Sequence, residues 1–196
     1  MFTIIPVKPF AQTKTRLAPL LSPQQRADLS RYLLKRTIKI ARQVGEVVVV
    51  SRDSEVRQVA KAAGAWALVE AGRELNDALH QAAEWARLRG AAQVLILPND
   101  LPLLTVADLR QLINAGSEMP AVVISPCRRY EGTNALLLRP PGLISFAFGR
   151  SSFVHHQQLA HAEGLEPLIY ISPNLALDLD IPADLRQIEA LLSLEW

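Results

Sequence analysis

The sequence has a single cysteine, little net charge and no long apolar run. Cys127 has no second cysteine to pair with, so an intrachain disulfide is excluded, which is consistent with a reducing cytoplasm. The 21 basic and 19 acidic residues leave a net charge of +2, which argues against a general nucleic-acid binder and against attachment to membranes by charge. No apolar run reaches transmembrane length, and the N-terminus lacks the basic region and apolar core of a signal peptide. We therefore expect a soluble cytoplasmic protein with no nucleic-acid or membrane partner.

Glycine is also absent from residues 8–17, the loop that follows the first predicted strand. The loop is therefore neither a Walker A loop nor a dinucleotide-binding fingerprint, since both need glycine. It carries Lys8, Lys14 and Arg16, and a basic loop that leaves the first strand of an α/β fold is well placed to bind phosphates. A basic loop that merely faces solvent is the alternative.

Buried strands and amphipathic helices alternate through the first half of the chain. Apolar residues make up 49% of the 196 residues, which is ample for a core, and we expect one domain over residues 1–196. The predicted strands are residues 2–7, 46–51, 66–69 and 93–97, and the predicted helices are residues 23–44, 54–64 and 75–89. This order is typical of a doubly wound, mostly parallel sheet.

The order changes after a further predicted helix at residues 106–115. Two predicted strands, 121–125 and 135–138, follow with only a polar turn between them, which indicates an antiparallel insertion in a mixed sheet. The remaining predicted elements are a helix at 153–163, a strand at 168–171, a strand end at 175–180 and a last helix that Pro182 begins.

The chain is organised around the stretch Leu95-Ile-Leu-Pro-Asn-Asp-Leu-Pro-Leu-Leu104. An apolar strand leads into a turn that carries Asp100, and a helix is expected to begin near Thr105. Ligands of open α/β sheets bind outside the carboxyl ends of the strands, where a carboxylate can hold a hard cation such as Mg²⁺. The alternative is that Asp100 only forms the turn or caps the helix.

Asp178 and Asp180 are two residues apart, so in an extended segment they project from the same face. Two carboxylates on one face repel each other unless a cation lies between them. Together with Asp100 they could form a divalent-metal cluster for phosphoryl or nucleotidyl transfer, in which the metal neutralises phosphate charge. The alternative is that Asp180 caps the helix begun by Pro182 and that Asp178 is merely exposed.

Gly149-Arg150-Ser151-Ser152 precedes a predicted helix, and backbone N–H groups at a helix N-terminus bind anions. The serine hydroxyls and Arg150 could add donors, although an ordinary serine-capped helix is the alternative. Gly132-Thr133-Asn134 is a turn that places a hydroxyl and an amide next to a buried strand, which is a weak signal by itself.

The histidines and the cysteine are expected to have structural or surface roles. His156 and His161 are five residues apart, a poor spacing for one metal site on a helix, and His80 lies on another predicted helix. His155 is included in the same expectation. Cys127 lacks an evident histidine partner, so a thiol nucleophile is not expected.

Taken together, these segments resemble the 2-phospho-L-lactate guanylyltransferase family of coenzyme F-420 biosynthesis, whose bacterial members include phosphoenolpyruvate guanylyltransferases. The resemblance runs nearly end to end. The motifs that carry it, in order, are Pro6-Val-Lys8 with Lys14-Thr-Arg-Leu17, Leu75-Asn76-x-Ala-Leu79, Asp100-Leu-Pro-Leu-Leu104, Gly132-Thr-Asn-Ala-Leu136, Gly149-x-x-Ser-Phe153 with His156, and Leu177-Asp-Leu-Asp180 before Pro182.

The resemblance implies a three-layer α/β/α fold with a mixed, mostly parallel sheet of the nucleotide-diphospho-sugar transferase-like (glycosyltransferase-A) type. It implies that GTP and a phosphorylated three-carbon acid, phosphoenolpyruvate or 2-phospho-L-lactate, give a guanosine diphospho-linked product and pyrophosphate. By similarity, the catalytic and Mg²⁺-binding residues are Asp100, Asp178 and Asp180, and the acid-binding residues are Thr133, Gly149 and Ser152. The residues implied to bind the nucleotide are Lys8, Lys14, Arg16 and Asn76.

The chain departs from the family pattern at a few positions. Thr15 stands where the family usually has Ser, and Ile181 replaces the usual Thr before the last helix. Arg150-Ser151 replaces a Pro-Gly-like pair and adds charge beside the acid, which leaves phosphoenolpyruvate, 2-phospho-L-lactate and 3-phosphoglycerate open.

Two other functions remain open at this point. One is a different nucleotidyltransferase of the same fold, for a molybdenum cofactor or a sugar phosphate, although those enzymes usually carry a glycine-rich first loop. The other is a non-catalytic nucleotide-binding protein. A homodimer is also compatible with the sequence.

Overall fold

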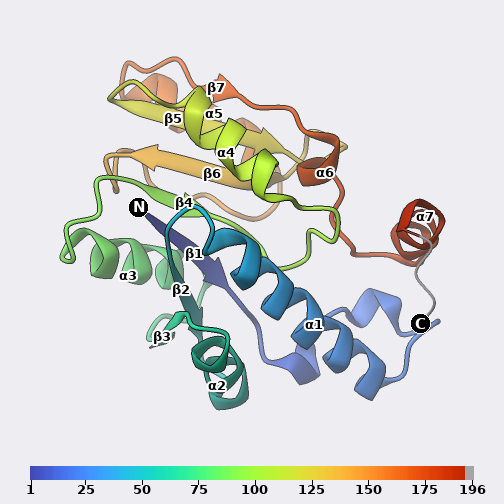
Figure 1. Cartoon of the computed structure of the whole chain (residues 1–196). Coiled ribbons are helices and arrows are strands. Elements are labelled where there is room, and N and C mark those ends of the chain that lie inside the picture. The colour runs from blue at the N-terminus through green and yellow to red at the C-terminus, as the bar shows by residue number, and fades with distance from the viewer. Residues whose placement is uncertain (193–196) are drawn as a thin grey trace.

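Strand β1 (Phe2–Pro6) lies near the middle of a seven-stranded sheet in the computed structural model, and the structure describes residues 1–192 (Figure 1). The other strands are β2 (Glu46–Ser51), β3 (Trp66–Val69), β4 (Val94–Ile96), β5 (Ala121–Pro126), β6 (Thr133–Arg139) and β7 (Leu168–Ile169). Their order is β3-β2-β1-β4-β6-β5-β7. β6 runs antiparallel to β4 and β5, and the other described pairs are parallel. The predicted mixed sheet with an antiparallel insertion is therefore confirmed.

Helices cover both faces of this sheet (Figure 1). They are α1 (Pro23–Ala41), α2 (Ser54–Ala62), α3 (Leu75–Arg87), α4 (Val106–Ala115), α5 (Ser152–Ala162), the short α6 (Pro173–Ala176) and α7 (Pro182–Leu192). Ile5, Val47 and Val49 share a core cluster with residues of α1, α2 and α4, whereas Ile4 and Val48 share another with residues of α3 and α5. The three layers follow because successive strand side chains point to opposite faces.

Local capping signals place several helix starts where the sequence predicts them. The Ser22 and Thr105 hydroxyls each accept a hydrogen bond from the N–H group three residues on, and Asp53 accepts one from two residues on. Such caps satisfy N–H groups that have no partner inside the helix. No helix within residues 1–192 is both long and apolar enough to cross a membrane.

The predicted strand end at 175–180 is wrong. Ser172 caps the short helix α6 by accepting the Leu175 N–H at 3.3 Å, and Pro173 occupies its first position. These helix-start signals favour a helix over the strand that the alternation of leucine with other residues predicts. Proline at the first helical position helps because its backbone φ angle already has the helical value. Beyond α6 the chain is extended but belongs to no strand, although Leu177 and Leu179 are buried as the alternation predicts.

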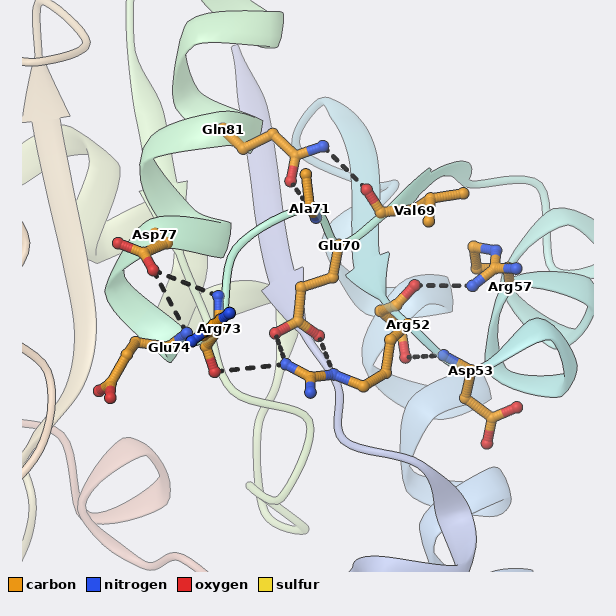
Figure 2. A network of polar contacts seen from close by, with 11 residues as sticks. Arg52, Asp53, Arg57, Val69, Glu70, Ala71, Arg73, Glu74, Asp77 and Gln81 are labelled. Carbon is orange, nitrogen blue, oxygen red and sulfur yellow. Dashed lines mark hydrogen bonds and ion pairs between the residues drawn. The ribbon is translucent and has the colours of Figure 1, made fainter.

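A polar network ties the loop between β3 and α3 to the end of β2 (Figure 2). The Arg52 guanidinium donates to both carboxylate oxygens of Glu70, at 3.2 and 2.5 Å. Asp77, in the first turn of α3, accepts the N–H groups of Arg73 and Glu74, each at 3.3 Å. The carboxyl ends of β2 and β3 are therefore held together, which gives this edge of the sheet a defined shape.

Candidate active site

The loop after β1 and the turn after β4 meet at the carboxyl edge of the sheet. The Lys14 ammonium lies 2.9 Å from Asp100 Oδ2 and 3.4 Å from Asp180 Oδ1, and the lysine side chain is only 7% exposed. Burial lowers the pKa of Lys14, but the charges of Asp100 and Asp180 outweigh burial and raise it above its ordinary value. The amine is therefore a buried, charged group held between two carboxylates.

Asp178 and Asp180 reach this edge on the extended segment that follows α6. Leu177 and Leu179 are buried in a third core cluster with residues of α1 and α7, so the two aspartates project the other way. The Leu179 N–H donates to the Asp100 carbonyl oxygen at 3.0 Å. Burial, and next the negative charge of Asp100, raise the pKa of Asp178. The structure thus brings the three predicted carboxylates to one place.

These carboxylates are oxygen donors of the kind that Mg²⁺ prefers. Among the side chains that the structure describes, no three of aspartate, glutamate, histidine or cysteine form a metal-binding group, and Lys14 fills the position between Asp100 and Asp180. Crowded negative charge contributes to the raised pKa of Asp178, and a divalent cation would relieve it. The donor chemistry therefore fits Mg²⁺ if the ammonium moves aside, and the metal remains a prediction.

Asp184, in the first turn of α7, binds the backbone of the segment that carries Asp180. Its Oδ2 accepts the N–H groups of Asp180 and Ile181 at 3.0 and 2.9 Å, at the start of α7. Its Oδ1 lies 3.4 Å from the Arg128 guanidinium. The Asp180 carboxylate faces Lys14 instead, so the capping alternative for Asp180 is wrong.

A cavity of about 470 Å³ opens beside the carboxylates. The charged residues of its lining are Arg16, Arg128, Arg129, Glu131, Arg150, Asp178, Asp180 and Asp184. Guanidinium groups suit phosphate and carboxylate ligands, which they can bind through two parallel hydrogen bonds. Sequence reasoning misses Arg128 and Arg129, whose only signal is the polar turn between two neighbouring strands.

Thr133, Gly149 and Ser152, the residues predicted to bind the acid, lie close together. Gly149 lines the cavity with a φ of +135°, a conformation that favours glycine, whereas Thr133 and Ser152 are buried behind the cavity wall. The Thr133 N–H donates to Ser152 Oγ at 2.9 Å. The residues converge because β6 is antiparallel and therefore begins at the edge where β4 and β5 end.

His156 has the structural role that the sequence predicts, directly behind these residues. The ring is fully buried, with Nδ1 2.9 Å from Thr133 Oγ1 and Nε2 accepting the Ala147 N–H at 3.0 Å. Burial, and next the charge of His155, lower the pKa of His156 to about 4. The ring is therefore neutral at neutral pH.

The residues predicted to bind the nucleotide are spread out. Arg16 lies 3.6 Å from Asp180 Oδ2 at the cavity, and Lys8 is exposed and outside the cavity lining. Asn76 also lies outside the lining, where its amide accepts the Phe148 N–H at 2.9 Å and donates to the Phe148 carbonyl at 3.2 Å. The structure thus gives Asn76 a clamping role on the loop before α5, and contact with a nucleotide stays a prediction.

Nearly the whole chain matches one protein family. Residues 1–192 match the family described as guanylyl transferase CofC like. The phosphoenolpyruvate guanylyltransferase of Rubrobacter xylanophilus is 42% identical over 192 residues, which cover 97% of this chain and 94% of that protein. The 2-phospho-L-lactate guanylyltransferase of Methanothermobacter thermautotrophicus is 40% identical over 187 residues, which cover 94% of this chain and 82% of that protein.

Solved structures with the same fold are more distant in sequence. A Desulfovibrio desulfuricans G20 protein assigned to the nucleotide-diphospho-sugar transferases superposes with a TM-score of 0.76 at 18% identity, over 97% of this chain and 86% of that one. A 4-diphosphocytidyl-2C-methyl-D-erythritol synthase gives a TM-score of 0.66 at 17% identity, over 97% and 98%. The predicted nucleotide-diphospho-sugar transferase-like fold is confirmed. From its full-length match and its identity to two named guanylyltransferases, the chain belongs to the guanylyl transferase CofC-like family.

Proposed function

We propose that this chain transfers the guanylyl group of GTP to the phosphate of a three-carbon acid, phosphoenolpyruvate or 2-phospho-L-lactate, and releases pyrophosphate. The relatives described above are named for transfer to these two acids. The observation that carries the proposal is the buried Lys14 ammonium between Asp100 and Asp180, at the edge of a cavity rich in arginine. The reaction would belong to coenzyme F-420 biosynthesis in the cytoplasm.

The proposed reaction is an in-line displacement at the α-phosphorus of GTP. A phosphate oxygen of the acid forms a bond to this phosphorus, and the bond from the phosphorus to the oxygen bridging the α- and β-phosphates breaks. Pyrophosphate leaves with the electron pair of that bond. No nucleophile from the protein is needed, because positioning and charge neutralisation provide most of the catalysis in such transfers.

The residues of the site divide between the two substrates. Lys14 and Arg16 would bind the triphosphate of GTP, since both lie beside the acidic cluster. Arg150 and the helix start at Ser152 would bind the acid, because guanidinium and helix N–H groups both favour anions. Mg²⁺, when bound by the three aspartates, would neutralise phosphate charge and orient the two reacting groups.

Pyrophosphate release tests this function directly. The chain would be supplied with GTP and Mg²⁺ and separately with phosphoenolpyruvate, 2-phospho-L-lactate or 3-phosphoglycerate, with ATP and CTP in place of GTP as controls. Release with GTP and one acid supports the proposal, and Asp100→Asn should lower the rate roughly a hundredfold or more because charge stabilisation is lost. Asp28→Asn, on the exposed face of α1, is the matched control.

Release with none of the acids would overturn the proposal. A sugar phosphate and a molybdenum-cofactor precursor would then be supplied as acceptors, to test the other nucleotidyltransferases of this fold. A non-catalytic nucleotide-binding protein would show a GTP-dependent rise in melting temperature without turnover of any acceptor, because a ligand that binds the native state stabilises it.

A further inference from the structure

A single buried imidazole links two parts of the proposed acid site. His156 is 0% exposed on α5, and its two ring nitrogens face different segments of the chain. Nδ1 lies 2.9 Å from Thr133 Oγ1 at the start of β6, and Nε2 lies 3.0 Å from the backbone nitrogen of Ala147. Ala147 belongs to the loop that leads to Gly149 at the cavity, so the ring joins strand, helix and loop.

The contact with Ala147 decides which ring nitrogen carries the proton. A backbone N–H group can only donate, so Nε2 of His156 has to accept and is unprotonated. A neutral imidazole has one N–H group, which is therefore on Nδ1. It follows that Nδ1 donates to the Thr133 hydroxyl and that the hydroxyl oxygen accepts.

The Thr133 hydroxyl hydrogen is then available for another acceptor. Within residues 1–192, the only hydrogen bond of this hydroxyl is the one to His156. Thr133 is next to Gly132 in the chain, and Gly132 lines the cavity. Ser152 Oγ likewise accepts the Thr133 N–H, and no described residue accepts the hydrogen of the Ser152 hydroxyl. Two hydroxyl donors therefore lie just behind the wall of the cavity, next to the lining residues Gly132 and Ser151.

We infer that His156 is a positioning residue that makes the Thr133 hydroxyl a hydrogen-bond donor to the anionic acid in the cavity. The inference rests on the proposed function, because the acid's phosphate or carboxylate is the acceptor. With the proton on Nε2 instead, Nδ1 would accept the Thr133 hydroxyl hydrogen and leave the acid no donor there. The protonation of one ring nitrogen thus sets the direction of a hydrogen bond to substrate.

The surroundings of His156 keep the ring in this orientation. The Phe148 ring meets it edge-on, with centroids 4.7 Å apart. The Asn76 side chain holds Phe148 in turn, through both its backbone N–H and its carbonyl. A donor that is already oriented before the acid arrives costs little reorganisation when the acid binds.

Two substitutions of His156 separate the two ring contacts. In His156→Asn, the side-chain amide nitrogen takes the place of Nδ1 and can still donate to Thr133. In His156→Gln, the amide takes the place of Nε2, so it can accept from Ala147 but the donor to Thr133 is lost. We expect His156→Gln to raise the KM for the acid by about tenfold or more, as for loss of a hydrogen bond to a charged group, and His156→Asn to raise it clearly less. The KM for GTP should stay unchanged in both.

Thr133 provides the second half of the test. Thr133→Val should raise the KM for the acid as His156→Gln does, and Thr133→Ser should restore it. Combining Thr133→Val with His156→Gln should add little, because the two changes remove the same hydrogen bond. His161→Asn, an exposed histidine on the same helix, is the matched control. Melting temperatures would be measured for every variant, so that loss of folding is recognised.

Each outcome decides the inference. Three results would show a general structural role for His156 and overturn the inference. They are equal effects of His156→Asn and His156→Gln on the KM for the acid, additive effects of His156→Gln and Thr133→Val, and a matching rise in the KM for GTP. ¹⁵N spectra of the histidine rings at neutral pH provide an independent readout, because a proton on Nε2 of His156 would also overturn it. If wild-type protein releases no pyrophosphate with any acid, the proposed function itself fails and this inference fails with it. If the wild-type protein is active but the variants leave the KM for the acid unchanged, only the inference is overturned.

Discussion

The backbone N–H of Leu179 donates to the backbone carbonyl of Asp100 at a distance of 3.0 Å. This hydrogen bond joins the turn after β4 to the segment that carries Asp178 and Asp180, although the two lie far apart in the sequence. The Leu179 side chain is 1% exposed in a core cluster with residues of α1 and α7, so packing and hydrogen bonding hold the segment together. The position of the acidic cluster therefore depends on an apolar side chain that points away from it.

Leu179→Ala should weaken both the fold and the acidic cluster. Removing a fully buried leucine side chain costs about 2–5 kcal/mol of unfolding free energy, and looser packing should raise the Mg²⁺ concentration needed for half-maximal activity. Urea unfolding and a Mg²⁺ titration of pyrophosphate release would measure the two effects. Leu20→Ala, at a position that is 49% exposed, should change neither. A destabilised Leu179 variant with an unchanged Mg²⁺ requirement would show that this packing does not position the aspartates.

Lys14→Met should destabilise the protein when Mg²⁺ is absent. The substitution leaves the Asp100 carboxylate without its cation and leaves Asp180 with the exposed Arg16 as its described ion-pair partner, and an unpaired, partly buried charge is costly. Because Asp180 is 43% exposed, solvent screening reduces the loss, which we expect to be about 1–3 kcal/mol. Thermal unfolding with and without Mg²⁺ would measure it.

Mg²⁺ should raise the melting temperature of the Lys14→Met variant more than that of wild type, since the metal then has no ammonium to displace. Lys8→Met is the matched control, because Lys8 is exposed on the same loop. Equal stability of wild type and Lys14→Met without Mg²⁺ would contradict the neutralising role of Lys14.

Asp108→Asn should loosen the attachment of α6 to α4. The buried Asp108 carboxylate accepts hydrogen bonds from Thr105, Ser172 and Asn174, and an amide cannot accept them all. We expect a loss of about 1–3 kcal/mol in urea unfolding at neutral pH. Asp28→Asn, in an exposed pair with a neighbouring arginine on α1, should cost far less.

The effect of Asp108→Asn should also depend on pH. Burial raises the pKa of Asp108, but its hydrogen bonds, first from Ser172 and then from Thr105, outweigh burial and bring it below the ordinary value of 3.8. A folded pKa below the unfolded one stabilises the protein fully above pH 3.8, and this stabilisation is lost as the pH falls through the folded pKa. The difference between wild type and variant should therefore shrink in strong acid, and a constant difference would contradict this account.

His156 should make the protein less stable as the pH falls from 6.5 towards 4. Burial, and next the charge of His155, lower its pKa from 6.5 to about 4, so in this window the unfolded chain binds a proton that the folded chain does not. The contribution of His156 to stability is therefore greatest above pH 6.5, and its loss by pH 4 is on the order of 3 kcal/mol. Urea unfolding at several pH values should give a shallower dependence for His156→Asn. His161→Asn, which is exposed, should follow wild type, and a His156→Asn curve parallel to wild type would contradict the assignment.

Much of the candidate site could be predicted residue by residue, because its signals are local. Asp100 follows an apolar strand, Gly149 and Ser152 precede a helix, and Asp178 and Asp180 alternate with leucines. The position of Arg128 and Arg129 at the cavity could not be predicted, because the sequence of a polar turn does not show which cavity the turn faces. The same holds for the role of Asn76, whose partner Phe148 is remote in the sequence.

By itself the sequence determined most of the strands, the starts of the long helices and the order of layers in this protein. The helix caps Ser22, Asp53 and Thr105 bind N–H groups within one helical turn, and hydrophobic periodicity is a property of a single helix or strand. Short stretches of sequence are therefore sufficient to predict these elements. Only the tertiary structure decided that Lys14 lies between Asp100 and Asp180. That contact depends on the pairing of β1 with β4 and on the third core cluster, and both join segments that no local pattern links.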